Sequence, residues 1–132
     1  LKFIRRENLI DKVIFTGYKD KQDLLYLYNG ATLFVFPSIY EGFGLPPLEA
    51  MRCGVPVISS DRASMPEVIG DAGVLVDPYN VEKWTEKITE LLENENLREN
   101  LVKKGLERSK FFTWRKTAVE TIEVYKRVIN DL

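Results

Sequence analysis

The chain has 132 residues, of which 45% are apolar and 30% are charged, a composition typical of one ordinary globular domain with its own core. Its 19 basic and 20 acidic side chains give a formal net charge of -1, so no strong field favours nucleic acid or an anionic membrane. The absence of histidine from the sequence excludes imidazole bases, Ser-His triads and the usual zinc sites. Any chemistry must therefore come from carboxylates, backbone amides, lysine and arginine, or a bound ligand.

The sequence contains no apolar run of the length of a membrane span and no pattern of a secretion signal, so we expect neither. The single cysteine, Cys53, excludes an internal disulfide and fits a reducing compartment. The chain opens with Leu1 in the charged phrase "LKFIRREN", which is typical of the tail of a helix. We therefore interpret the chain as part of a longer protein.

The first predicted elements are a strand and a helix. Residues 13–17, "VIFTG", form a short β-branched and aromatic run that predicts a strand. Residues 20–31 predict a helix that places Leu24, Leu27 and Tyr28 on one face.

Strands and helices then continue to alternate. Residues 32–37, "TLFVFP", form a continuous apolar run, which suits a central parallel strand covered on both faces. A helix over 46–52, a strand over 55–60, a short helix over 64–70 and a strand over 73–77 follow. This rhythm predicts an α/β fold with a doubly wound parallel sheet, which binds ligands at the carboxyl ends of its strands.

The remainder of the chain is predicted to be helical. Asn80 can cap a helix over 81–93, Asn94 can cap a second helix, and Thr113 can cap a third that runs towards Asn130. Apolar residues recur at helical spacing in all three helices: Trp84, Ile88, Leu91 and Leu92; Leu97, Leu101 and Leu106; Trp114, Ala118, Ile122, Tyr125 and Ile129. We expect these residues to face inward.

The loop 38–44 follows an apolar strand and therefore lies where a doubly wound sheet places its ligand. Gly42 and Gly44 permit backbone angles that are closed to other residues, and they let a ligand approach the main chain. The helix that follows should leave free amides around Gly44, Leu45 and Leu48. Together with the helix dipole, these amides favour an anion such as a phosphate.

Two carboxylates flank these glycines, Glu41 before them and Glu49 about one turn into the helix. A phosphate would repel both, so sugar hydroxyls are the better partners. A nucleotide sugar has this layout, with phosphate in the middle and a polyol on each side. The competing interpretation is a tight strand-to-helix turn with two solvated acids, which a bare E-G-x-G would favour.

The longer strings "FPSIYEGFGLPPLEAMRCGVPVISSD" and "PEVIGDAGVLVDP" resemble the C-terminal half of group 1, or GT4-type, glycosyltransferases of the GT-B fold. The resemblance implies that residues 1–132 are a single, truncated nucleotide-sugar-binding domain, a Rossmann-like half of that fold, without the N-terminal acceptor domain and the first strands. It also implies a retaining, metal-independent enzyme with an E-x7-E signature, which Glu41 and Glu49 match.

The resemblance also assigns roles to individual residues. Glu41 becomes the catalytic candidate, at the hydroxyls of the donor sugar, and Glu49 accepts hydrogen bonds from the ribose. Tyr18 and Lys19 border the nucleobase, usually through backbone contacts. The implied donor-binding residues are Gly42, Phe43, Gly44, Leu45, Glu49, Tyr18 and Lys19.

The implied full-length function is transfer of a hexose from a nucleotide sugar to a carbohydrate or lipid-linked acceptor, as in polysaccharide biosynthesis. We expect no cofactor, no metal and no nucleic-acid partner, and a cytoplasmic protein that is compatible with peripheral membrane association. The family also uses an Arg and a Lys from upstream strands at the diphosphate. The isolated chain should therefore bind its donor weakly and transfer nothing.

Two other classes of function stay open. One is a nucleotide-sugar epimerase or a phosphorylase of similar architecture, which would usually place histidines or other acid-base groups in the cleft. The other is a non-enzymatic, flavodoxin-like binding module, which would not select nucleoside diphosphates.

Several polar residues near the proposed cleft are candidates with ordinary alternatives. Asp61 follows a strand end and is also a common turn residue, and Glu67 suits the first turn of a short helix. Arg52 and Arg62 are expected to be solvated, although Arg62 is close enough in sequence to reach a phosphate. Cys53 is expected to be a small buried filler rather than a nucleophile.

Overall fold

Three parallel strands form the sheet of this protein, whose computed structural model describes residues 1–130. Strands β1 (Phe34–Phe36), β2 (Val57–Ser60) and β3 (Val74–Val76) lie in the order β1-β2-β3. Val35 pairs with Ile58, and Ile58 pairs with Val74. The predicted parallel α/β architecture is therefore confirmed.

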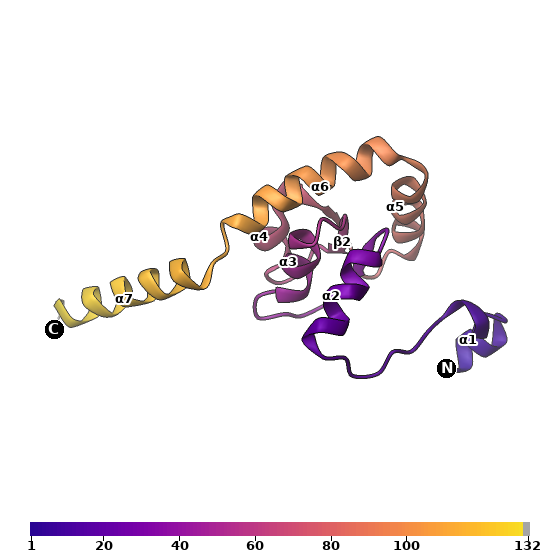
Figure 1. Cartoon of the computed structure of the whole chain (residues 1–132), viewed down its shortest axis with the longest axis horizontal. Coiled ribbons are helices and arrows are strands. Elements are labelled where there is room, and N and C mark those ends of the chain that lie inside the picture. The colour runs from indigo at the N-terminus through magenta and orange to yellow at the C-terminus, as the bar shows by residue number, and fades with distance from the viewer. Residues whose placement is uncertain (131–132) are drawn as a thin grey trace.

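Helices make up most of the remaining described chain (Figure 1). They are α1 (Lys2–Arg6), η1 (Ile10–Lys12), α2 (Lys21–Gly30), α3 (Leu45–Arg52), α4 (Met65–Ile69), η2 (Gly70–Ala72), α5 (Val81–Glu93), α6 (Glu95–Lys110) and α7 (Trp114–Asn130). The predicted caps are confirmed: Asn80 accepts from the amide of Lys83 and Asn94 from the amide of Leu97, each at 2.9 Å. Thr113 likewise accepts from the amide of Lys116 at 3.2 Å.

The core has two parts, one on each face of the sheet. Because side chains alternate along a strand, β2 directs Val57 into the part beneath α3 and α4, and Ile58 into the part beneath α5. Helix α6 contributes to both, since Leu101 packs with Ile58 while Gly105 brings α6 against Met51 of α3. Helices on both faces make the sheet doubly wound, as predicted.

The two ends of the chain lie outside this core. Figure 1 shows α7 projecting away from the body formed by the sheet and its helices, and α1 lying apart from it at the other end. Neither helix contains a buried residue. The prediction that the apolar face of α7 points inward is therefore wrong for the described chain, where Trp114 is 80% exposed.

The predicted strand over 13–17 is not formed. A strand needs a neighbour for its backbone hydrogen bonds, and none of the three strands among residues 1–130 pairs with this segment. The segment is extended and outward-facing, with Ile14 86% exposed. Its β-branched residues predicted a strand, but within residues 1–130 none is formed there.

Strand β1 is shorter and less buried than predicted. It lies at an edge of the three-stranded sheet, and Val35 is half-exposed at 41%. Strand β2 takes the central place instead, and all four of its residues are buried. The apolar run at 32–37 therefore correctly predicted a strand, but its central position was wrong.

Candidate functional site

The candidate site is built on the turn that joins β1 to α3. Gly44 is the N-cap of α3 and has φ 105° and ψ 50°, in the left-handed region. It is also buried, and a Cβ built at this position would overlap the side chain of Met65 from α4. Only glycine satisfies both conditions, so the turn depends on this residue.

A run of backbone amides in this turn has no internal acceptor. Within residues 1–130, the amides of Gly42, Phe43, Gly44 and Leu45 donate no hydrogen bond to the protein. The amide of Leu48 likewise donates no hydrogen bond to the Gly44 carbonyl, so within residues 1–130 the free amides predicted around Gly44, Leu45 and Leu48 are all found. The available donors therefore lie before the helix and in its first turn, where Pro46 and Pro47 have none.

Serine hydroxyls fix the carbonyls of the same turn, although no motif in the sequence predicted these contacts. Ser64, which precedes α4, donates to the Phe43 carbonyl at 2.7 Å and lies 3.3 Å from the Glu41 carbonyl. Ser60 is fully buried at the end of β2 and donates to the Ser38 carbonyl. The sequence signal was the string "SSDRAS", which places three serines just where β2 reaches the ligand-binding edge.

Glu41 lies in the middle of the turn and is half-buried. Its Oε1 accepts a hydrogen bond from the Ser38 hydroxyl at 2.9 Å. This bond orients the carboxylate from within the turn and leaves its other oxygen available.

Glu49 lies on α3 and is exposed. Its Oε2 accepts from the Tyr28 hydroxyl of α2 at 3.1 Å. Burial of the phenol, together with the nearby charge of Glu49, raises the pKa of Tyr28 to about 12. Tyr28 therefore stays a hydrogen-bond donor over the whole physiological range.

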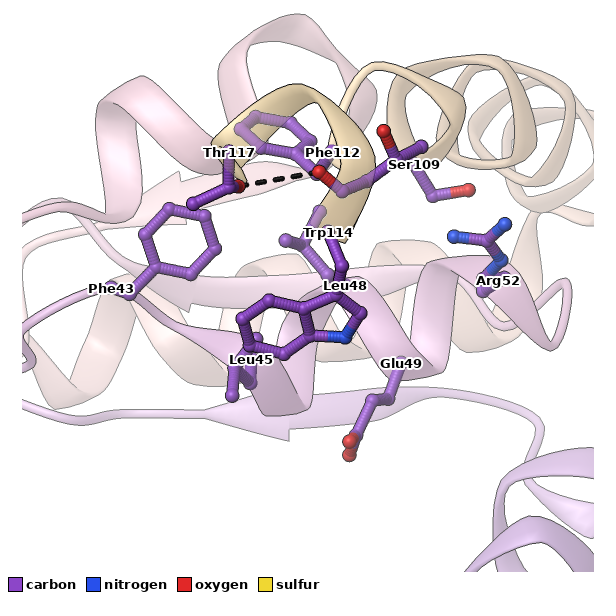
Figure 2. A pocket seen from close by; sticks show the side chains of 10 residues that line it. Phe43, Leu45, Leu48, Glu49, Arg52, Ser109, Phe112, Trp114 and Thr117 are labelled. Atoms are coloured by element: carbon purple, nitrogen blue, oxygen red, sulfur yellow. Dashed lines mark hydrogen bonds between the residues drawn. The ribbon is translucent and has the colours of Figure 1, made fainter. Parts of the chain in front are cut away.

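A cavity of about 670 Å³ opens beside α3, between that helix and the connection from α6 to α7. The rings of Phe43, Phe112 and Trp114 gather on one side of it, and Glu49 and Arg52 lie towards the other (Figure 2). Its remaining lining residues are Leu45, Leu48, Ser109, Thr113 and Thr117. The cavity brings Phe43, Leu45 and Glu49 together, while Glu41 lies outside it.

The structure does not bring Tyr18 and Lys19 to this turn. Tyr18 is 97% exposed in the extended segment before α2. Lys19 lies 3.9 Å from Asp23, one helical turn further along. Their proposed place beside a nucleobase stays a prediction.

The other polar candidates have structural partners. The Arg62 guanidinium bridges Asp61 at 3.1 Å and Asp77 at 3.2 Å, across the carboxyl ends of β2 and β3. Glu67 is exposed on α4, and Arg108 binds its carbonyl rather than its carboxylate. Burial, and then the charge of Glu49, raises the pKa of the Cys53 thiol, which disfavours the thiolate of a nucleophile.

The Arg62 bridge gives a testable expectation for Asp77. The Tyr79 amide, which donates to the Asp77 carboxylate at 3.1 Å, and then Arg62 hold the pKa of Asp77 below its usual value. A lowered folded-state pKa stabilises the fold above the unfolded pKa, and this contribution is lost as the pH falls through the folded value. We expect Arg62→Gln to raise the pKa of Asp77 without restoring its usual value, as measured by carboxyl NMR titration.

A matched control removes a different cation. Lys83→Gln breaks a pair with Glu86 on α5 and should leave the titration of Asp77 unchanged. A complete return of Asp77 to its usual pKa in Arg62→Gln would contradict the dominant role given to the Tyr79 amide.

The arrangement suits recognition of an anion and of hydroxyls. Unbonded amides donate, and two carboxylates on either side accept. Within residues 1–130, no three His, Cys, Asp or Glu side chains converge on a potential metal site, and the expected metal independence stays a prediction. None of the described helices combines the length and the apolar character needed to cross a bilayer.

The fold and this turn together define a doubly wound α/β domain with a ligand-binding edge at the carboxyl ends of its strands. The model of the family described as "Glycosyl transferases group 1" matches residues 2–108. The chain belongs to this family. The resemblance seen in the sequence is thereby confirmed.

Known relatives and structures agree with this assignment. The chain is 47% identical, over 112 residues, to O-antigen chain mannosyltransferase B of Escherichia coli, covering 85% of this chain and 29% of that protein. Sucrose-phosphate synthase from Thermosynechococcus elongatus superposes with a TM-score of 0.87 and 31% identity, over 99% of this chain and 34% of that one. A mutant of S. aureus TarM, solved with Fondaparinux, alpha-GlcNAc-glycerol and UDP, superposes with a TM-score of 0.80 and 28% identity. This match covers 90% of this chain and 24% of the TarM chain. The chain thus spans about a third or less of each of these three proteins.

Proposed function

We propose that this chain is the donor-binding part of a retaining glycosyltransferase, which takes a hexose from a nucleotide sugar and transfers it to an acceptor hydroxyl. The observation that carries the proposal is the run of four unbonded amides at residues 42–45, at the N-terminus of α3. Family membership supports the reaction class, and the UDP in the TarM structure supports a nucleoside diphosphate as the ligand.

The diphosphate is proposed to bind at these amides. The dipole of α3 adds a favourable partial charge at the same end, and the amides are already oriented because Ser64 holds the neighbouring carbonyls. As the bond from sugar to phosphate breaks, negative charge develops on the departing diphosphate. Fixed amides stabilise that charge without reorganisation.

The two carboxylates are proposed to bind the two sugars of the donor. Glu41, oriented by Ser38, takes the hydroxyls of the transferred hexose, and Glu49 takes the ribose. Mannose is the hexose that we propose, from the name of the Escherichia coli relative. We also propose that no metal or cofactor takes part, and that the acceptor is a carbohydrate or a lipid-linked carbohydrate bound by a further domain.

Neither competing class has comparable support. An epimerase or a phosphorylase would use the same crevice, but family membership and the name of the relative favour transfer. A flavodoxin-like binding module would have no need for two carboxylates flanking an unbonded amide run. It also predicts no selectivity among nucleoside diphosphates.

Calorimetric titration of the complete protein with UDP, GDP and ADP tests the proposal. We expect one of the three to bind selectively, and Glu49→Gln to weaken that binding by about tenfold, because a charged acceptor of a ribose hydroxyl is lost. Glu93→Gln, at the exposed end of α5, is the control and should bind as the wild type does. Unselective or absent binding of all three nucleotides would refute the proposed function.

A further inference from the structure

We propose that Tyr28 is a positioning residue that sets the ribose selectivity of Glu49; this inference rests on the proposed function. Tyr28 lies 21 residues before Glu49 in the sequence, and on a different helix, yet its hydroxyl donates to Glu49 Oε2 at 3.1 Å. Glu49 also lines the 670 Å³ cavity, so a ligand can reach the carboxylate that Tyr28 holds.

The ring of Tyr28 is itself held in place. It packs edge-on against Phe34 of β1, with centroids 5.5 Å apart, and Phe34 stacks on Phe36 at 5.9 Å. Tyr28 is half-buried, whereas every other residue of α2 is exposed. The sheet therefore fixes the phenol, and the phenol fixes the carboxylate.

The hydrogen bond from Tyr28 restricts Glu49, an exposed side chain that would otherwise sample several rotamers. Restricting it to one orientation removes a conformational cost from ligand binding. One lone pair of Oε2 is used by Tyr28, while Oε1 has no partner among the described residues. The oriented carboxylate can then accept from the vicinal hydroxyls of a ribose, and it discriminates against a sugar that lacks one of them.

The phenol is a constant donor. Its pKa of about 12 keeps it protonated at every pH at which the protein would be assayed. The effect on selectivity should accordingly not vary between pH 6 and pH 9, roughly the range that lies between the usual pKa values of carboxylates and phenols.

The test compares ribose and deoxyribose binding in the complete protein. Affinities are measured by calorimetry for whichever of UDP, GDP and ADP binds most tightly, and for its 2′-deoxy form. We expect Tyr28→Phe to reduce the ribose preference by about three- to tenfold, as for loss of one hydrogen bond, with little change in the affinity for the deoxy form. Tyr26→Phe is the matched control, because Tyr26 lies on the same helix and its hydroxyl accepts from Gln22 instead.

The outcomes separate this inference from the proposed function. If Glu49→Gln loses the ribose preference while Tyr28→Phe keeps it, Tyr28 only anchors α2 and the inference is wrong, although the function stands. If both lose it and the double variant loses no more, the two residues act as a unit, as proposed. If neither loses it, the ribose assignment of Glu49 fails together with the inference.

Discussion

Replacing Gly44 by alanine is expected to lower the free energy of unfolding by about 2 kcal/mol, mainly through left-handed backbone strain. The backbone has φ 105° at this position, and the new Cβ would overlap the terminal Cε of Met65, the fully buried first residue of α4. Because that atom is the free end of a flexible side chain, Met65 can shift to relieve the overlap, and the backbone strain makes up most of the expected loss. Urea unfolding followed by circular dichroism measures the effect.

The adjacent glycine provides the control. Nothing lies within 4 Å of a Cβ built at Gly42, and its φ is not positive. Gly42→Ala should therefore change the unfolding free energy by no more than about 0.5 kcal/mol. Equal losses in the two variants would show that the strain assigned to Gly44 is absent.

The sequence predicted helices better than strands because helical signals are local. The bounds of α5, Val81–Glu93, were predicted to the residue, since Asn80 and Asn94 cap it and the next helix by side-chain bonds to nearby amides. Strand pairing depends instead on which segments become neighbours. The run at 13–17 has the composition of a strand, yet no described strand lies beside it.

In the candidate site, too, local features could be predicted from the sequence and contacts between distant residues could not. The strain at Gly44 and the start of α3 follow from a short motif, so the turn was predictable from the sequence. The contacts of Ser64 with Phe43 and of Tyr28 with Glu49 join residues 21 apart, and no spacing rule relates them.

Glu41→Gln is expected to lower the rate of sugar transfer by about 10² to 10³-fold while nucleoside diphosphate affinity stays unchanged. The substitution keeps the size of the side chain but replaces a charged acceptor beside the proposed hexose by a neutral amide. Because Glu41 is separated from Glu49 and lies outside the cavity that Glu49 lines, the two carboxylates should affect different parts of the donor. Steady-state kinetics with the nucleotide sugar, together with calorimetry of the nucleotide alone, measures both effects.

Ser38→Ala tests how much the orientation of the Glu41 carboxylate contributes to transfer, separately from its charge. It removes the 2.9 Å hydrogen bond to Glu41 Oε1 and leaves the charge in place, so a loss of about tenfold in transfer is expected. If Glu41→Gln weakened nucleotide binding as strongly as transfer, Glu41 would contact the nucleotide rather than the hexose. If it left both unchanged, the catalytic assignment would be wrong, and the half-buried carboxylate would serve only to close the turn through Ser38.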